Sequence, residues 1–530
     1  MSAELSPVDH SNRIRRWWLP TIAVAVPVAL RGLLVVMNRY EIGLEFLFPV
    51  MMAFQFSAVL AGLVIGVWFL FFAGFSTFTR VSVSIAVLAL IATGFASVRK
   101  VEFDGQMTPR LWFRWEPSEE QLLGEHLAGA AKATDATDLT VGPTDSPAFR
   151  GPAGNGATPG VTLADWAAPP KVLWKHPVGG GHAGIAVAGN SAVTVEQRGD
   201  QEVIVCYDRA SGRERWAFGY PARFRQSEPM GGDGPRTTPA VVGGLVYSLG
   251  GAGELVCLDG ATGKPGWQVN VIVDNGAVPA EWGVSGSPLV VGERVFVNPG
   301  VNPADNKGQA VAAYDRLTGK KLWAAGRHPA AYASPVRATF AGVEKVLVFD
   351  AAGLGAHDPA TGAELWRFPW KTDMGMNSAQ PVLLPGDRVF VSSERSNGGA
   401  VVEVTKAGEK WQAKEVWRNR SLSARFCCPV FAAGHLYGLS EGRLVCVDAA
   451  TGKRKWAEGD FGNGQIVLAG DKLVVTGEKG KVVLVAADPA EYRELGSVPL
   501  FDARTWNVPA LAGKQLFARN HREMACLELP

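Results

Sequence analysis

The sequence predicts an all-β eight-bladed propeller preceded by an α-helical membrane region. Three long apolar runs fill the first hundred residues, a short motif of Asp, Thr-Gly and Trp recurs after residue 200, and hairpin signals separate its copies. The chain has 530 residues, of which 52 are basic and 50 acidic. This length leaves room for several domains of roughly 100–200 residues. The near-neutral charge favours no nucleic-acid partner.

The three apolar runs cover residues 17–37, 46–72 and 81–98, and Arg31 is the single charge among them. A membrane span needs about 20 apolar residues. We therefore predict three transmembrane helices in a membrane domain, residues 1–100, with the lipid bilayer as its partner. The second run is long enough to tilt or to include a short re-entrant piece. For Arg31 we favour a side chain that snorkels to the interface over a functional charge.

Basic residues around the spans bear on their orientation. Arg13, Arg15 and Arg16 precede the first span and favour a cytoplasmic N-terminus. Three spans then place the rest of the chain outside the cytoplasm, although Arg99 and Lys100 favour the opposite orientation. We expect the outside placement.

Residues 101–170 are predicted to be a juxtamembrane segment and linker. Residues 106–115 mix aromatic and basic side chains, as a segment at a lipid surface does. Residues 119–132 have the composition of a short helix. From residue 133 to 170, Ala, Gly, Pro, Thr and Asp predominate, which is typical of irregular coil.

One motif recurs five times: an Asp, a Ser/Thr-Gly pair three and four residues later, and a Trp eight residues after the Asp. A β-type stretch precedes each copy, and the Gly can adopt the positive φ of a tight turn. We expect each Asp to hydrogen-bond its own turn, as a structural group and not a catalytic acid. The copies begin at Asp208, Asp259, Asp315, Asp358 and Asp448 and end at Trp216, Trp267, Trp323, Trp366 and Trp456.

A second pattern, a Pro followed by an aromatic residue eight positions later, marks a preceding hairpin in the same units. With Trp174 and Trp417 as further closing residues, and Leu495 in the Trp position of a degenerate unit, residues 171–530 divide into eight units of about 45 residues. Such four-stranded antiparallel units form a propeller. The strand at 171–178 supplies the one that the last unit lacks, which closes the ring and removes a free edge.

The Asp-x-x-Thr-Gly-x-x-x-Trp signature resembles the tryptophan-docking motif of bacterial PQQ-like (pyrrolo-quinoline quinone) repeat propellers, a superfamily with BamB-like and quinoprotein alcohol dehydrogenase-like members. The resemblance implies that each Trp is a structural wedge between neighbouring blades. It also implies a bacterial inner membrane protein with a periplasmic propeller, in the setting of envelope assembly. Because function depends on sites and not on folds, the resemblance implies less about activity.

The adjacent pair Cys427-Cys428 resembles the vicinal disulfide that quinoprotein alcohol dehydrogenases place against their quinone. The repeat register favours a structural interpretation, because Cys428 occupies the position before Pro429 where other units have small or polar residues. The other four cysteines fall two residues before a motif acid, where a free Cys behaves as a small hydrophobe. Cys427 alone is unexplained by its repeat position.

Neither His357 nor His435 has a second His or Cys at ligand spacing, so we predict no metal site. The remaining candidates lie just before each inner strand and are rich in Arg, aromatic and amide groups, which suit a recognition surface. The alternative is a set of ordinary solvated loop residues. The candidate ring consists of Arg236, Trp282, Tyr332, Asn377, Arg425 and Trp506.

Two functions remain open. The first is an extracytoplasmic binding or scaffolding module with a protein, peptide or glycan ligand on the loop face. The second is a membrane-bound quinoprotein dehydrogenase of alcohols or sugars that uses PQQ and calcium. Calcium requires six to eight oxygen ligands. The nearest candidate segments, Asp274–Glu281 and Asp373–Asn377, supply few of them. We therefore favour the binding module, with no catalytic residue assigned.

Overall fold

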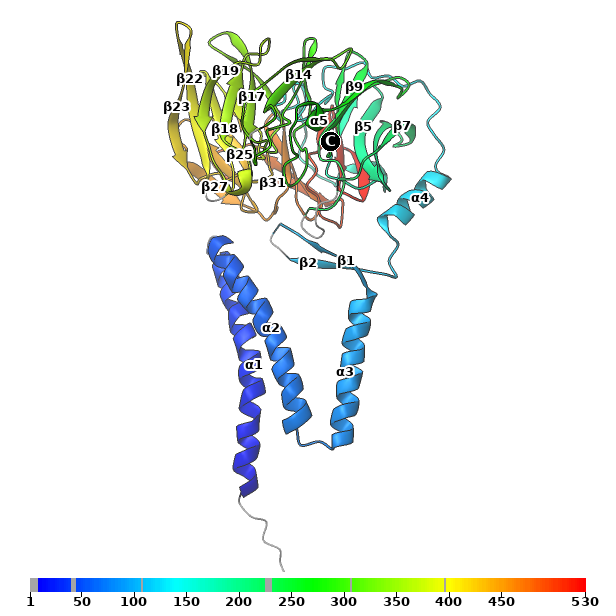
Figure 1. The fold of residues 1–530 in the computed structure, drawn as a ribbon, viewed down its shortest axis with the longest axis vertical. Coiled ribbons are helices and arrows are strands. Elements are labelled where there is room, and N and C mark those ends of the chain that lie inside the picture. Colours follow the sequence, from blue (N-terminus) through cyan, green and yellow to red (C-terminus); the bar gives the residue numbers. More distant parts are fainter. Residues whose placement is uncertain (1–7, 40–43, 106–107, 225–230, 306, 395–396) are drawn as a thin grey trace, which may run out of the picture. The chain divides into compact units, whose positions relative to one another are not determined.

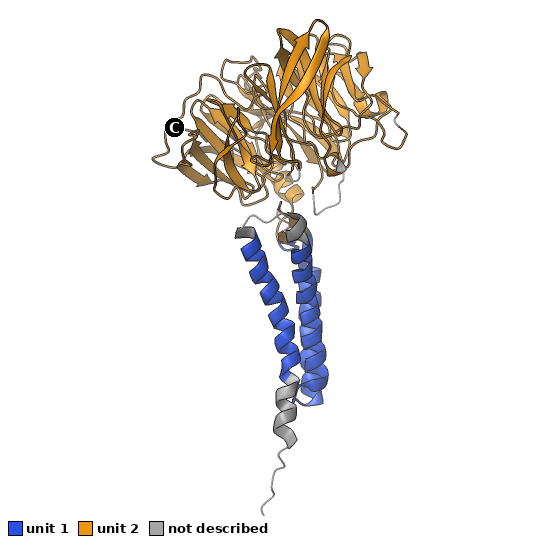
Figure 2. Ribbon diagram, turned by 90° about the vertical axis from the view of Figure 1, so that its left-hand side faces the viewer, with its two compact units in different colours: residues 1–100, 112–115 blue, residues 101–111, 116–530 orange. Residues whose placement is uncertain are grey.

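The computed structural model describes residues 8–39, 44–105, 108–224, 231–305, 307–394 and 397–530. The chain forms two compact units, the first comprising residues 1–100 with 112–115, the second residues 101–111 with 116–530 (Figure 2). Residues 101–111 and the predicted linker thus belong to the same unit as the propeller.

Three helices make up the first unit: α1 (Val8–Arg39), α2 (Leu44–Phe72) and α3 (Thr77–Ser97). Each contains a segment long and apolar enough to cross a membrane: Trp17–Met37, Pro49–Phe72 and Thr77–Ser97. Because α2 is one continuous helix, the second run contains no re-entrant piece. The third span begins at Thr77, earlier than the predicted residue 81, because the Ser76 hydroxyl caps the helix by accepting a hydrogen bond from the Thr79 amide.

A short sheet and a helix follow α3 in the sequence. Strands β1 (Val98–Phe103) and β2 (Pro109–Phe113) form the two-stranded sheet. Helix α4 (Glu119–Gly129) confirms the predicted helix and ends three residues earlier than expected. Its N-terminus is a capping box, in which Ser118 and Gln121 satisfy one another's backbone amides.

Eight four-stranded antiparallel sheets form the propeller that the sequence predicts (Figure 1). Blades 1 to 4 comprise β4 (Ala186–Ala188), β5 (Ser191–Arg198), β6 (Gln201–Asp208) and β7 (Glu214–Pro221); β8 (Ala240–Val242), β9 (Leu245–Leu249), β10 (Glu254–Asp259) and β11 (Pro265–Asn270); β12 (Leu289–Val291), β13 (Arg294–Val297), β14 (Val311–Asp315) and β15 (Lys321–Ala325); and β16 (Val336–Phe340), β17 (Val343–Asp350), β18 (Gly353–His357) and β19 (Glu364–Pro369).

Blades 5 to 7 comprise β20 (Val382–Leu384), β21 (Arg388–Ser392), β22 (Gly399–Ala407) and β23 (Lys410–Asn419); β24 (Val430–Ala432), β25 (His435–Ser440), β26 (Arg443–Asp448) and β27 (Arg454–Glu458); and β28 (Gln465–Ala469), β29 (Lys472–Thr476), β30 (Lys481–Ala486) and β31 (Glu494–Pro499). Two short helices, α5 (Val271–Asp274) and the 3-10 turn η1 (Asp373–Gly375), lie in connections between blades.

Blade 8 is built from both ends of the propeller sequence. Its strands are β32 (Ala510–Ala512), β33 (Gln515–Arg519), β34 (Glu523–Glu528) and β3 (Lys171–Pro177), with β3 pairing antiparallel to β34. Trp174 faces Cys526 across this pair, as Trp216 faces Cys206 in blade 1. The predicted ring closure is confirmed.

The repeated motif is a docking device between blades. In each of the five copies, the Asp Oδ1 accepts hydrogen bonds from the amide and the hydroxyl of the Ser/Thr three residues later. The Gly that follows has a positive φ and lies against the Trp of the preceding blade. A Cβ on Gly263, for example, would be 2.7 Å from the Trp216 ring. The indole Nε1 of Trp174, Trp216, Trp267, Trp323, Trp417 and Trp456 donates to a backbone carbonyl of the next blade.

Blade 7 departs from the predicted register. Gly496, and not Leu495, faces Leu484 at the position that Trp takes in the other blades. Trp166, from the predicted linker, covers this glycine: its backbone amide donates to the Leu495 carbonyl at 3.0 Å, and a Cβ on Gly496 would clash with the Trp166 Cβ and lie 3.1 Å from its ring. A tryptophan from outside the repeats thus lies against the residue that replaces the docking tryptophan.

The segment from residue 133 to 170 is irregular, as predicted, but it is packed into the propeller. Ser146 bridges to Val187 of β4, and Ala157 bridges to Leu468 of β28. The Arg150 side chain is buried and donates to the carbonyls of Cys428 and Pro429. This segment is therefore part of the propeller structure.

Candidate functional site

The candidate ring residues precede the inner strands of their blades, where each blade passes to the next; we call this side of the propeller the ring face. Trp506 makes several of the contacts on this face. Its ring centroid lies 5.3 Å from that of Phe426 and 5.5 Å from that of His182, and the Arg504 guanidinium lies 4.4 Å above it. Its Nε1 donates to Glu478 at 2.7 Å.

Arg425 extends this cluster, because its guanidinium lies 5.0 Å from the Phe426 ring. Residues from blades 1, 6 and 8 therefore form one aromatic and cationic surface. Cations over aromatic faces gain about 0.5–2 kcal/mol, depending on how far they are desolvated. Arg425, Phe426 and Trp506 are each partly exposed, so this surface remains accessible to a ligand.

Trp282 and Tyr332 form a second aromatic pair, with ring centroids 5.5 Å apart and planes inclined by 60°. Burial raises the pKa of Tyr332 to about 12, so its hydroxyl is a neutral hydrogen-bonding group at physiological pH. Arg236 lies in the same region, with its guanidinium 5.4 Å from the Phe224 ring and donating to the carbonyls of Gly232 and Gly234. Burial is the main cause, and the charge of the nearby Arg504 the second, that lowers the pKa of Arg236 to about 10. The guanidinium is therefore still charged at neutral pH.

Asn377 differs from the other five ring residues because it is fully buried. Its Nδ2 donates to the carbonyls of Asp350 and Trp370, and its Oδ1 accepts from the Ser393 hydroxyl at 2.6 Å. These bonds hold the connection between blades 4 and 5. Asn377 therefore does not offer its amide to a ligand on the ring face.

The chain's own residues 101–105 also contact the ring face. The Phe103 carbonyl accepts a hydrogen bond from Arg504 at 2.9 Å, and the Gly105 amide donates to Glu478 at 2.6 Å. The sequence gives no sign of these contacts, because Phe103 and Arg504 lie 401 positions apart.

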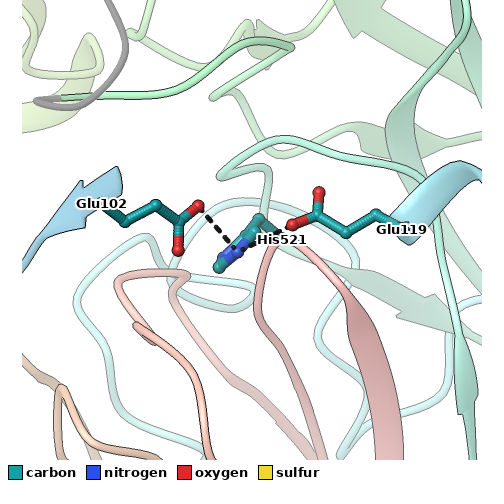
Figure 3. A group of neighbouring side chains, drawn as sticks. All are labelled: Glu102, Glu119 and His521. Atoms are coloured by element: carbon teal, nitrogen blue, oxygen red, sulfur yellow. Dashed lines mark ion pairs between the residues drawn. The ribbon is translucent and has the colours of Figure 1, made fainter. Parts of the chain in front are cut away.

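A cluster of the buried Glu102 and His521 with the half-buried Glu119 lies in the same unit (Figure 3). The His521 Nε2 is 3.4 Å from a carboxylate oxygen of each glutamate. Burial alone would lower the pKa of His521, but the two carboxylates raise it. Sequence reasoning predicted no metal site and missed this cluster, because no local spacing joins its members. Within the described residues, these three side chains form a group of His and Glu ligands close enough to hold one metal ion.

At the places where the sequence suggested calcium, Asp274 and Asn377 are already engaged by other groups. Asp274 accepts from the Tyr314 hydroxyl at 2.8 Å and pairs with Lys321 at 3.1 Å, and the Asn377 amide is fully engaged. Cys427 and Cys428 are free, buried thiols, and the Cys428 Sγ accepts from the Gln380 amide. These residues do not fit a calcium–PQQ site of the kind that the resemblance implied.

Fold and motif together define an eight-bladed PQQ-repeat propeller that follows three apolar helices. A family model described as outer membrane protein assembly factor BamB matches residues 200–458 and 350–529, more than half of the chain. The chain belongs to this family.

Individual proteins similar to this chain include a quinohemoprotein alcohol dehydrogenase and a BamB. A quinohemoprotein alcohol dehydrogenase from Comamonas testosteroni is 30% identical over 149 residues, which cover 26% of this chain and 20% of the enzyme. The crystal structure of that enzyme is 12% identical and aligns with a TM-score of 0.51 over 77% of this chain and 82% of its own. BamB from Moraxella catarrhalis is 14% identical, with a TM-score of 0.49 over 68% of this chain and 100% of its own. Because the sequence match spans about a fifth of the curated enzyme, its activity does not transfer to this chain.

Proposed function

We propose that this protein is a membrane-anchored binding and scaffolding propeller that holds a protein, peptide or glycan partner on its ring face. The observation that carries the proposal is the continuous surface of Arg425, Phe426 and Trp506, with Arg504 stacked on the Trp506 ring. Arginine and aromatic side chains are the groups most enriched where partners bind tightly.

Three further features support this proposal. The three apolar helices would anchor the propeller in a bacterial inner membrane, with its ring face in the periplasm. The matching family model carries the description of an outer membrane assembly factor, which suits a partner in the cell envelope. The motif Asp residues are all engaged in turns, so they are not available as acids or bases for catalysis.

Site-specific photocrosslinking of the full chain in its native membrane tests this proposal. A photoreactive side chain at Trp282 or Arg425 reports on the ring face, and one at Val416, an exposed residue of the outer strand β23, is the matched control. We expect one adduct of the same mass from both ring positions and none from Val416, and Trp506→Ala should abolish it. Adducts that form equally at all three positions, or that survive Trp506→Ala, would contradict the proposal.

A second candidate function is a membrane-bound quinoprotein dehydrogenase, favoured by the local 30% identity to the Comamonas testosteroni enzyme. When bound, PQQ with its calcium would accept electrons from an alcohol or sugar. Since the sites compared above do not fit this group, we assign no step of that chemistry to residues of this chain.

A further inference from the structure

Three separate parts of the second unit bring Glu102, Glu119 and His521 together (Figure 3). Glu102 is the penultimate residue of β1, and Glu119 is the first residue of α4, directly after its Ser118 cap. His521 lies in the tight turn between β33 and β34, where the Asn520 side chain accepts from the amides of residues 522 and 523. Each side chain therefore projects from a position that the local backbone structure fixes.

The two distances from His521 match the separation of ligand atoms around a metal ion. Bonds of 2.0–2.2 Å at tetrahedral angles place two donor atoms about 3.3–3.6 Å apart. The His521 Nε2 lies 3.4 Å from the nearest oxygen of Glu102 and 3.4 Å from that of Glu119. All three donor atoms lie within 4.8 Å of one another.

Burial supplies a second observation. His521 is 5% exposed and Glu102 is 4% exposed. Within the described part of the chain, neither ring nitrogen of His521 makes a hydrogen bond of ordinary geometry. A buried polar group without such a partner is costly, and Glu102 is a buried carboxylate beside the half-buried Glu119. A divalent cation would neutralise both carboxylates and use the Nε2 lone pair.

We propose that Glu102, Glu119 and His521 bind a divalent transition-metal ion of the zinc class. One imidazole nitrogen with two carboxylate oxygens is a donor set that suits zinc and its neighbours, whereas calcium prefers oxygen alone. The Arg504 guanidinium lies near enough to interact with the charges of Glu102 and Glu119, but its hydrogen bonds go to the carbonyls of Phe103 and Gly231.

A metal ion at this site would crosslink two parts of the second unit that are far apart in the sequence. Glu102 and Glu119 flank the segment that joins β1 to α4, and His521 belongs to blade 8. A metal held by all three would fix the chain before the propeller against the end of the propeller sequence. Closing so long a loop removes much entropy from the unfolded chain.

Metal binding to the full chain in detergent, after removal of metal with a chelator, tests the proposal. Calorimetric titration with zinc should give one equivalent per chain, and titration with cobalt should give the intense visible absorption of a four-coordinate site. Glu119→Gln should weaken zinc binding by roughly a hundredfold, the upper end of the loss known for changes around a metal site. The matched control is Glu120→Gln, the exposed neighbour on the same helix, which should leave affinity unchanged.

His521→Ala provides a second variant, and its circular dichroism spectrum shows whether the propeller remains folded. The cobalt spectrum of the unaltered protein tests the site even if a variant fails to fold. Zinc uptake well below one equivalent, a cobalt spectrum of the hydrated ion, or equal affinity in Glu119→Gln and Glu120→Gln would each overturn the proposal. These outcomes do not depend on whether the ring face binds a partner.

Discussion

Replacement of Trp166 by alanine should destabilise the propeller, although this residue lies outside every repeat. Trp166 is 7% exposed and packs in a core that includes Leu163, Val467 and Leu500. An indole buries about 150–250 Å², which at about 25 cal/mol per Å² corresponds to about 4–6 kcal/mol. Truncations of buried aromatic residues typically cost about 3–5 kcal/mol. We therefore expect Trp166→Ala to lower the free energy of unfolding by about 3–5 kcal/mol.

Urea unfolding of the full chain in detergent, followed by β-sheet circular dichroism, measures this loss. With an m-value of about 3 kcal/mol per M, the midpoint should fall by about 1 M or more. The control is Asp165→Ala, because this neighbour is exposed and its ion pair with Lys472 spans 3.7 Å. Exposed pairs contribute about 0–1 kcal/mol. Equal midpoints for Trp166→Ala and the unaltered protein would refute the role given to this tryptophan.

Two further predictions concern the blades. Gly263 and Gly244 have similar φ angles of 71° and 77°, but only Gly263 lies against an indole, that of Trp216. Gly263→Ala should therefore cost about 1–3 kcal/mol more than Gly244→Ala in the same urea assay, and equal costs would show that the close contact is unimportant. Burial alone would raise the pKa of the Glu196 carboxyl, but Arg198 and a second guanidinium hold it below the usual 4.5. Its stabilising contribution is thus present above the unfolded pKa and lost as the pH falls through the folded value. Unfolding midpoints measured across that acid range should vary less with pH in Glu196→Gln, and an unchanged pH dependence would contradict this assignment.

The contacts that repeat from blade to blade could be predicted from the sequence. Each motif Asp accepts hydrogen bonds from the Ser or Thr three residues later, and each Trp contacts the turn of the next unit. Both contacts therefore recur in the sequence at a fixed spacing. The closing strand could be predicted for the same reason, because the last unit visibly lacks one. The ring face as a binding surface stays a prediction from the residue types before the inner strands, and burial removes Asn377 from it.

Contacts that do not repeat from blade to blade could not be predicted from the sequence. Trp166 covers Gly496 from a coil segment, and the register shift in blade 7 makes Leu495 appear to occupy the Trp position. Glu102 and His521 meet only because the ring closes, since a distance of several hundred residues leaves no local pattern. Composition therefore indicated a linker where the structure has a packed part of the propeller.

Titration of the purified full chain with PQQ and calcium tests most directly whether this propeller is a binding module or a quinoprotein enzyme. We expect no saturable change in the absorbance of PQQ and no reduction of an artificial electron acceptor when alcohols or sugars are added. Binding of one equivalent of PQQ that requires calcium, together with substrate-dependent reduction of the acceptor, would contradict the binding-module assignment.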